Sequence, residues 1–193
     1  MAELGDWDAY LAKLDGHDFL RRFDRHVGRA FKRAGLLLVG EMRKAVRAGK
    51  YAPNAPLTKA MKGSSKPLVD RGDLMRALTY DVYKLGTAWV LDVGINRQAR
   101  GKGGMVYNLG RALHEGFTLK VTPAMRAAVF AKLAERQGAK RAAAVRAKIA
   151  GLGAHAVWVI PPRPFIMDPV LHNWPQVRGL MQEAYSKALR GED

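Results

Sequence analysis

The feature that most restricts the fold is an unbroken helical pattern of about thirty residues near the start of the chain. Between about Asp18 and Ala48, apolar residues recur every three or four positions, among them Leu20, Phe23, Val27, Ala34, Leu38 and Met42. This spacing places them on one face of an α-helix. Thirty residues at about 1.5 Å each make a rod of roughly 45 Å, longer than most globular helices. Three glycines within it predict bends or the close approach of another helix: Gly28, Gly35 and Gly40.

After this helix, the hydrophobic pattern changes to that of strands. The runs 78–83 and 88–95 are rich in β-branched and aromatic residues and are separated by a short segment containing Gly86, which predicts a β-hairpin. Similar patterns predict strands at 117–122 and 154–160. Further helices are expected at 6–14, 72–77, 106–115, 124–137, 139–149 and 169–189.

Together these elements predict an α+β fold. We expect a small antiparallel sheet of about four strands, flanked by the long N-terminal helix, a helical insertion and a C-terminal helix. The length of 193 residues suits one domain, so residues 1–193 are expected to form a single α+β domain. The segment 121–153 is the expected helical insertion within that domain.

The charge is far from balanced. The chain has 33 Lys and Arg against 17 Asp and Glu, a net charge of +16. Most of the excess lies in 21–50 and 123–150, and the loop 96–104 adds three bases without an acid. Such self-repulsion points to a polyanion or an acidic protein surface as partner, although solvated helix faces would give the same pattern. Candidate contacts to DNA or an acidic partner are Arg97, Arg100, Lys102, Arg126, Lys140, Arg141 and Arg146.

The chain lacks the patterns expected of common enzymes. It has no cysteine, so disulfides, thiolate metal sites and cysteine nucleophiles are excluded. His114-Glu115 resembles the start of a zinc-protease helix, but Thr118 occupies the position of the second histidine. No apolar run is long enough to span a membrane. We therefore expect a soluble, non-enzymatic protein without a metal, a cofactor or a catalytic residue.

Three stretches taken together resemble a known family. They are Lys66–Leu78, the segment Leu113–Phe117 with its His-Glu-x-Gly pattern, and the Ile-Pro-x-Arg-Pro-Phe pattern of Ile160–Ile166. In this order, the sequence is similar to tailed-bacteriophage virion-morphogenesis proteins, also called tail-completion or head–tail joining proteins. The similarity covers roughly residues 55–189.

The resemblance implies a structural phage virion protein of the neck or tail end. Such a protein forms a ring, usually hexameric, that completes the tail and joins it to the DNA-filled head. The implied location is the virion, after assembly in the host cytoplasm. Implied partners are further copies of the chain, neighbouring neck and tail proteins and genomic DNA in the channel, with no membrane. Bases facing the channel would attract phosphates, whereas bases facing outward would meet acidic rings. The alternative is a stand-alone basic protein that binds nucleic acid without sequence specificity.

The proline-rich turn 161–165 is the candidate interface or turn-fixing site. Its prolines restrict the backbone, so docking costs little conformational entropy. We expect Phe165 to be buried and Arg163 to form a charge-assisted hydrogen bond that fixes the turn, with Pro162 beside it. A rigid connector between a strand and a helix is the plain alternative.

Overall fold

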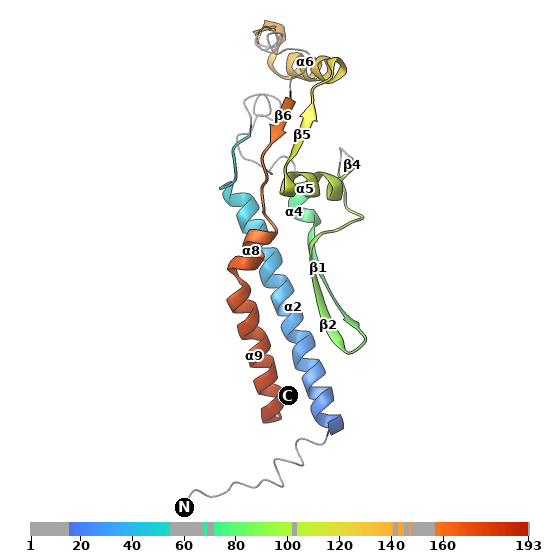
Figure 1. Ribbon diagram of the computed structural model, residues 1–193, viewed down its shortest axis with the longest axis vertical. Helices are drawn as coiled ribbons and strands as arrows, with labels where there is room; N and C mark the ends of the chain where they lie inside the picture. The colour runs from blue at the N-terminus through green and yellow to red at the C-terminus, as the bar shows by residue number, and fades with distance from the viewer. Residues whose placement is uncertain are drawn as a thin grey trace, which may run out of the picture. The chain divides into compact units, whose positions relative to one another are not determined.

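The computed structural model describes residues 16–54, 68, 72–101, 104–140, 143–144, 147 and 157–192 (Figure 1). The expected helix at 6–14 lies outside them. The chain divides into two compact units, each assembled from separate stretches. Unit 1 comprises Met1–Arg43, Leu78–Gly94 and Ile166–Asp193; unit 2 comprises Lys44–Ala77 and Ile95–Phe165. The sequence predicts one domain, and the segment expected as an insertion falls within unit 2.

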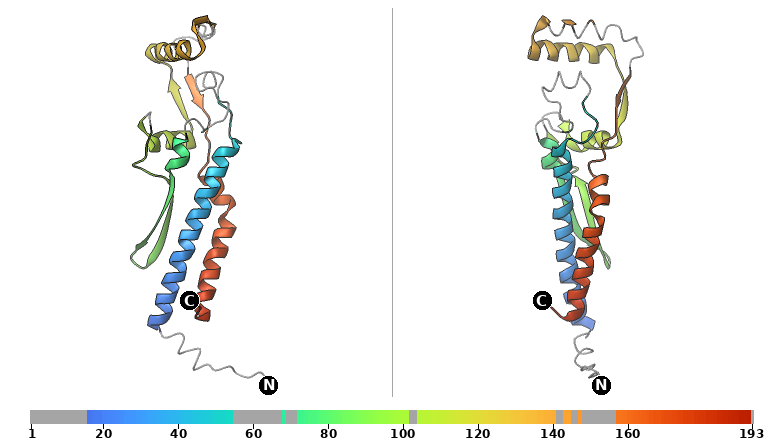
Figure 2. Two further views of the ribbon diagram at one scale, coloured as in Figure 1. Left: turned by 180° about the vertical axis from the view of Figure 1, so that it is seen from behind. Right: turned by 90° about the vertical axis from the view of Figure 1, so that its left-hand side faces the viewer.

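Unit 1 is built on the long helix. Helix α2 covers Gly16–Ala48, which confirms the predicted helix almost to the residue. Strands β1 (Leu78–Leu85) and β2 (Ala88–Ile95) form the predicted hairpin, and helices α8 (Met167–His172) and α9 (Trp174–Arg190) complete the unit. Figures 1 and 2 show α9 running beside α2. Ala34, Leu38 and Val177 are the buried centre of the packing between these elements.

Two glycines of α2 let the hairpin approach closely. A Cβ atom at Gly35 would lie 2.3 Å from the ring of Tyr80, and one at Gly28 would lie 2.8 Å from the ring of Trp89. The sequence predicted close approaches at these glycines, but the approaching element is a β-hairpin and not a helix. Asp24 anchors the hairpin further, because it pairs with Lys84 and accepts a hydrogen bond of 3.2 Å from Trp89 Nε1. The Lys84 ammonium and the Trp89 indole hold the pKa of Asp24 below its usual range.

The C-terminal segment forms two helices instead of the expected single helix over 169–189. Its break lies at Asn173, whose side-chain Nδ2 donates to Pro169 O at 2.7 Å. Pro175 has no N–H to continue the first helix but suits the first turn of the second. At the far end of α9, Gly191 adopts a left-handed conformation, and His26 Nε2 lies 2.8 Å from Glu192 O. The chain is thereby tied back to α2.

Unit 2 contains α4 (Asp73–Ala77), β3 (Arg100–Gly101), β4 (Gly104–Met105), α5 (Val106–Glu115), β5 (Phe117–Lys120), α6 (Pro123–Gln137) and β6 (Val157–Ile160). Strands β5 and β6 are antiparallel, with Phe117 opposite Ile160 and Lys120 opposite Val157. Helix α6 begins as the sequence predicts. Thr122 caps it by accepting a hydrogen bond from Met125 N, and Pro123 occupies its first turn.

The α+β class, the long N-terminal helix and the C-terminal helical region are confirmed. The arrangement of the strands differs from the expected sheet. In the described part of the chain, the strands form three separate two-stranded ladders, β1–β2, β3–β4 and β5–β6. The β1–β2 hairpin packs on α2 in unit 1, whereas β5–β6 belongs to unit 2. None of the described helices is long and apolar enough to cross a membrane.

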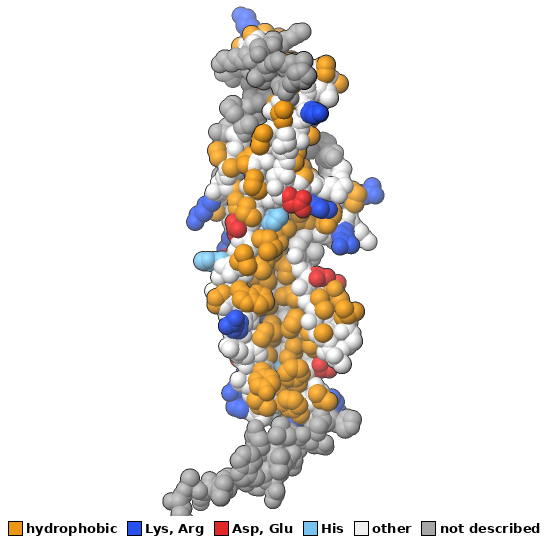
Figure 3. All heavy atoms as spheres, in the orientation of Figure 1, with side chains coloured by type: hydrophobic (Ala, Val, Ile, Leu, Met, Phe, Trp, Pro, Cys, Tyr) orange, Lys and Arg blue, Asp and Glu red, His pale blue; other side chains and the backbone are white. Residues whose placement is uncertain are grey.

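Unit 1 also leaves large apolar side chains exposed. Figure 3 shows hydrophobic side chains gathered along the surface over α2 and α9. Leu20 is 58% exposed, and Trp174 and Tyr185 are 53% and 51% exposed. Exposed apolar patches of this kind are typical of surfaces that contact another molecule.

Candidate functional site

The three stretches that carry the family resemblance come together in unit 2, around helix α5. From the first, Leu74 packs against α5 so closely that a Cβ atom at Gly110 would lie 3.1 Å from Leu74 Cδ1. The second stretch is the end of α5 and the start of β5. The third leads from β6 into the turn 161–165, which we call the Arg163 turn. The motifs therefore pack against each other, and two of them are paired strands.

Gly116 explains the His-Glu-x-Gly pattern in physical terms. It joins α5 to β5 with φ 74° and ψ 160°, a backbone conformation that residues other than glycine rarely adopt. A Cβ atom at this position would lie 2.7 Å from Pro162 N and 2.9 Å from Ile160 O. Both neighbours are backbone atoms, so the Arg163 turn can pass this close only because residue 116 has no side chain.

Arg163 fixes the turn from inside the unit. It is only 5% exposed. Its Nε donates to Ala52 O at 3.3 Å and its Nη2 to Asn54 Oδ1 at 3.4 Å. Its backbone N–H donates to Leu113 O and His114 O, which are carbonyls at the end of α5.

The acceptors of the guanidinium are thus neutral carbonyl oxygens, and burial lowers the pKa of Arg163. The side chain holds the segment 52–54 against the turn. Such a buried guanidinium is a structural tie and is closed off from ligands.

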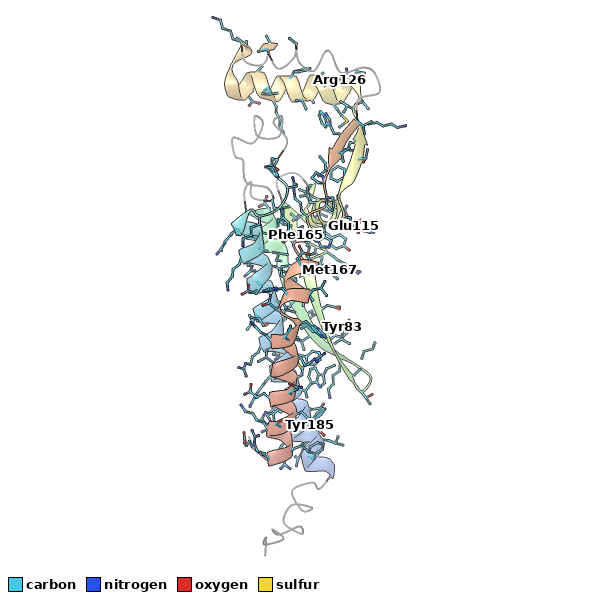
Figure 4. The ribbon with its side chains drawn as sticks, turned by 60° about the vertical axis from the view of Figure 1, so that its left-hand side comes forward. Tyr83, Glu115, Arg126, Phe165, Met167 and Tyr185 are labelled. Atoms are coloured by element: carbon cyan, nitrogen blue, oxygen red, sulfur yellow. The ribbon has the colours of Figure 1, made fainter. Side chains whose placement is uncertain are left out.

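Phe165, labelled in Figure 4, completes the turn. Its side chain is fully buried, and its ring meets the His114 ring edge to face, with centroids 5.4 Å apart. The Phe165 N–H donates to Arg163 O at 2.7 Å, which closes a three-residue turn around Pro164. Of the three residues proposed for this site, only Pro162 is exposed. Any contact of this turn with another subunit would have to be made through Pro162 and the surface around it.

The burial of Arg163 sets what its removal should do. With Arg163→Ala, Ala52 O and Asn54 Oδ1 lose the hydrogen bonds from Arg163 inside unit 2, so we expect a loss of about 1–3 kcal/mol in free energy of unfolding. Urea denaturation followed by circular dichroism measures the loss.

Arg163→Lys keeps a cation with a single donor group and should lose less. Arg111→Ala is the surface control. Arg111 pairs with Glu115 at 2.9 Å, but both side chains are more than half exposed, so its loss should stay within about 0.5 kcal/mol. Equal losses for Arg163→Ala and Arg111→Ala would contradict the structural role of Arg163.

The candidate DNA or partner contacts lie on different elements. Arg97 and Arg100 are exposed beside and within β3, and Lys140 is exposed after α6. Arg126 is half-buried in the first turns of α6, where it is labelled in Figure 4. The remaining three, Lys102, Arg141 and Arg146, lie outside the described residues.

The segment around Arg100 is more regular than the irregular loop that its composition predicts. Arg100 pairs with Met105 and Gly101 with Gly104, forming the β3–β4 ladder. Asn96 accepts a bond from Gln98 N through its side chain, and its own N–H donates to Ala77 O at 2.8 Å. These bonds hold Arg97 and Arg100 outward at the surface.

Sequence reasoning missed a polar hollow of about 280 Å³ in unit 1. It is lined by α2, α9 and the segment after α9, and it contains Arg29, Arg33 and Lys187 together with Glu183. Glu183 lies 2.7 Å from Lys187 and 3.8 Å from Arg33, and these cations lower the pKa of Glu183, the bond from Lys187 contributing most. The hollow also contains Glu192, so two carboxylates face three bases and offset most of their charge.

Within the described ranges, no group of three or more histidine and carboxylate side chains could hold a metal ion. The His114 side chain packs on Phe165, and Glu115 pairs with Arg111, so this zinc-protease-like pair serves packing and helix stability.

Compared with family models, with curated proteins and with solved structures, the chain finds no match.

Proposed function

We propose that this chain is a non-enzymatic structural protein of a tailed-phage virion. It acts at the neck or the tail end, as a ring that completes the tail and joins it to the DNA-filled head. The family resemblance of the three motif stretches suggests this role, and six copies is the expected number in the ring. The protein would be part of the virion, with neck and tail proteins as its neighbours.

One observation carries the proposal, namely that the three motif stretches pack together in unit 2. Arg163 is used within the unit, where it donates to Ala52 and Asn54. Leu74 and Phe165, one from the first stretch and one from the third, are buried. Catalysis needs polar side chains that a substrate can reach. In this unit, residues of the motifs serve packing and turn geometry, as a structural protein requires. This arrangement therefore supports an assembly role.

The surface of unit 1 supports the same role. A ring built from identical copies needs two different patches on each copy, each complementary to the other. Large apolar side chains that gather on one exposed surface, as they do over α2 and α9, are typical of contact sites. The net charge of +16 gives the ring an attraction to packaged DNA or to acidic neighbouring rings.

The test is a phage in which the gene for this chain carries an early stop codon. Particles from this phage should separate into DNA-filled heads and finished tails, seen by negative-stain electron microscopy. Supplying the intact chain from a plasmid should restore joined, infectious particles. Complete virions in the absence of the chain would overturn the proposal.

The charge also favours a second candidate, a stand-alone protein that binds nucleic acid without sequence specificity. Such a protein would bind DNA as a free monomer or dimer, with an affinity that falls steeply with salt. Neutralising Arg97, Arg100 and Lys140 together should then reduce the dependence on salt by about three phosphate contacts. Strong binding by the free chain, together with complete virions in its absence, would favour this candidate.

A further inference from the structure

Unit 1 exposes a cluster of aromatic side chains where α2 and α9 lie side by side. Phe23 of α2 meets Tyr185 of α9 edge to face, with ring centroids 6.2 Å apart. Phe19 stacks on Phe23 at 5.9 Å. Tyr185, labelled in Figure 4, stays 51% exposed, and Leu20 on α2 is 58% exposed. The cluster is therefore only partly covered by the unit itself.

The cluster continues along α9. Trp174 precedes Met181 by seven residues and Tyr185 by eleven, so the three share one face of the helix. Trp174 is 53% exposed, and Met181 packs against the core of Ala34 and Leu38. In Figure 3, hydrophobic side chains run along this surface. The α2–α9 apolar face, as we call it, consists of Phe19, Leu20, Phe23, Trp174, Met181 and Tyr185.

A segment of the chain outside the described residues has the complementary pattern. Within residues 1–15, large apolar residues recur at helical spacing: Trp7, Tyr10, Leu11 and Leu14. The same segment has four acids and one base, a net charge of −3 in a chain whose total is +16. At 100° per residue, Asp6 and Asp8 would fall on the two sides of the apolar stripe. An acidic, amphipathic segment of this kind matches an apolar face on a basic protein.

The segment is poorly placed to cover the face of its own copy. Only Asp15 separates the expected helix, which ends at Leu14, from the first residue of α2, Gly16. Antiparallel helices need a connection of about two to five residues, so the segment is too closely tethered to fold back. If α2 instead continued straight into the segment, Leu14 would precede Phe23 by nine residues, or two and a half turns. The stripe would then face away from the α2–α9 apolar face.

We propose that residues 1–15 of one copy dock on the α2–α9 apolar face of a neighbouring copy. The segment and the face are different surfaces, so each copy offers one to either neighbour, which is the head-to-tail contact that closes a ring. Trp7 and Leu11 supply the apolar anchors, and the acids of the segment meet the positive field of the neighbour. The exposed Arg178, four residues after Trp174, lies on that side of α9. This inference rests on the proposed function, since it names the contact by which the ring forms.

Cysteine cross-linking tests the contact directly, because the chain has no natural cysteine. One full-length preparation carries Leu11→Cys and a second carries Tyr185→Cys. After mixing and mild oxidation, the species of twice the single-chain mass of 21.3 kDa should contain the disulfide between Leu11→Cys and Tyr185→Cys, identified by peptide mass spectrometry. Gln176→Cys is the matched control, because residue 176 is exposed on α9 but lies nine residues from Tyr185, on the opposite face.

Each outcome decides the proposal. Cross-linking of Leu11→Cys to Tyr185→Cys, well above that to Gln176→Cys, supports it. No disulfide, or equal yields with both partners, overturns it. A double variant that closes a disulfide within one chain, without linking copies, also overturns it because the segment then covers its own copy.

A second measurement gives the size of the effect. Trp7→Ala removes one anchor and should weaken self-association about 30-fold in sedimentation equilibrium, with the circular dichroism spectrum almost unchanged. An unchanged association constant contradicts the proposed anchor. The outcomes also separate this inference from the proposed function. If joined particles require the chain but still form when residues 1–15 are deleted, the proposed function holds and only the proposed contact is overturned.

Discussion

Phe165→Ala should lower the free energy of unfolding of unit 2 by about 3–5 kcal/mol. Phe165 is the largest fully buried side chain of the described residues, and its ring packs edge to face on His114. Truncation removes the apolar burial and leaves a cavity beside His114. Urea denaturation gives the overall loss. Amide hydrogen exchange in α5 and β5 should show faster opening there than in α2.

Two variants control for this prediction. Phe165→Leu keeps most of the apolar volume and should lose at most about 1.5 kcal/mol. Met167→Ala removes a side chain of similar size two residues further along, but Met167 is 49% exposed, so the loss should be within about 0.5 kcal/mol. If Phe165→Ala were no more destabilising than Met167→Ala, the packing of the Arg163 turn against α5 would be wrong.

Gly116→Ala should destabilise unit 2 by about 2–6 kcal/mol. One part is conformational, because alanine is strained at φ 74° and ψ 160°, at about 1–3 kcal/mol. The other part is steric, because the new methyl group would lie 2.7 Å from Pro162 N and 2.9 Å from Ile160 O, and relieving such overpacking costs about 1–3 kcal/mol. Neither backbone atom can move away without disturbing the pairing of Phe117 with Ile160.

The chain contains a matched control for the conformational part. Gly138 follows α6 with φ 81° and ψ 156°, nearly the conformation of Gly116, and a Cβ atom there would meet nothing within 4 Å. Gly138→Ala should therefore lose only the conformational part in the same denaturation experiment. The difference between the two variants measures the close approach of the Arg163 turn. Equal losses would mean that the turn does not press on residue 116.

Periodicity predicted the individual elements well, because each depends on residues close together in the sequence. The apolar spacing over 18–48 and the paired strand runs before and after Gly86 correspond to α2 and the β1–β2 hairpin. The break at Asn173 had a local signal as well. Pro175 and the side chain of Asn173 mark it, but the apolar spacing on both sides of them continues across it.

The partners of these elements could not be predicted, since they come from distant parts of the chain. Arg163 bonds to Ala52 and Asn54, which lie more than a hundred residues earlier. The sequence shows Gly116 as part of a motif. The need for glycine at this position comes from Pro162, which passes close to the backbone of residue 116. The strands likewise suggested one sheet, because alternation predicts a strand without naming its neighbour. Pairing in three separate ladders depends on packing that no local pattern encodes.

The division of unit 1 into three stretches has a consequence for biosynthesis. Helix α2 leaves the ribosome early, but its partner α9 ends at Arg190. At a synthesis rate of about 5–20 residues per second, α9 follows α2 after a delay on the order of ten seconds. During that delay, a chaperone would need to shield the apolar face of α2. Unit 1 can therefore be completed only after α9 has been synthesised.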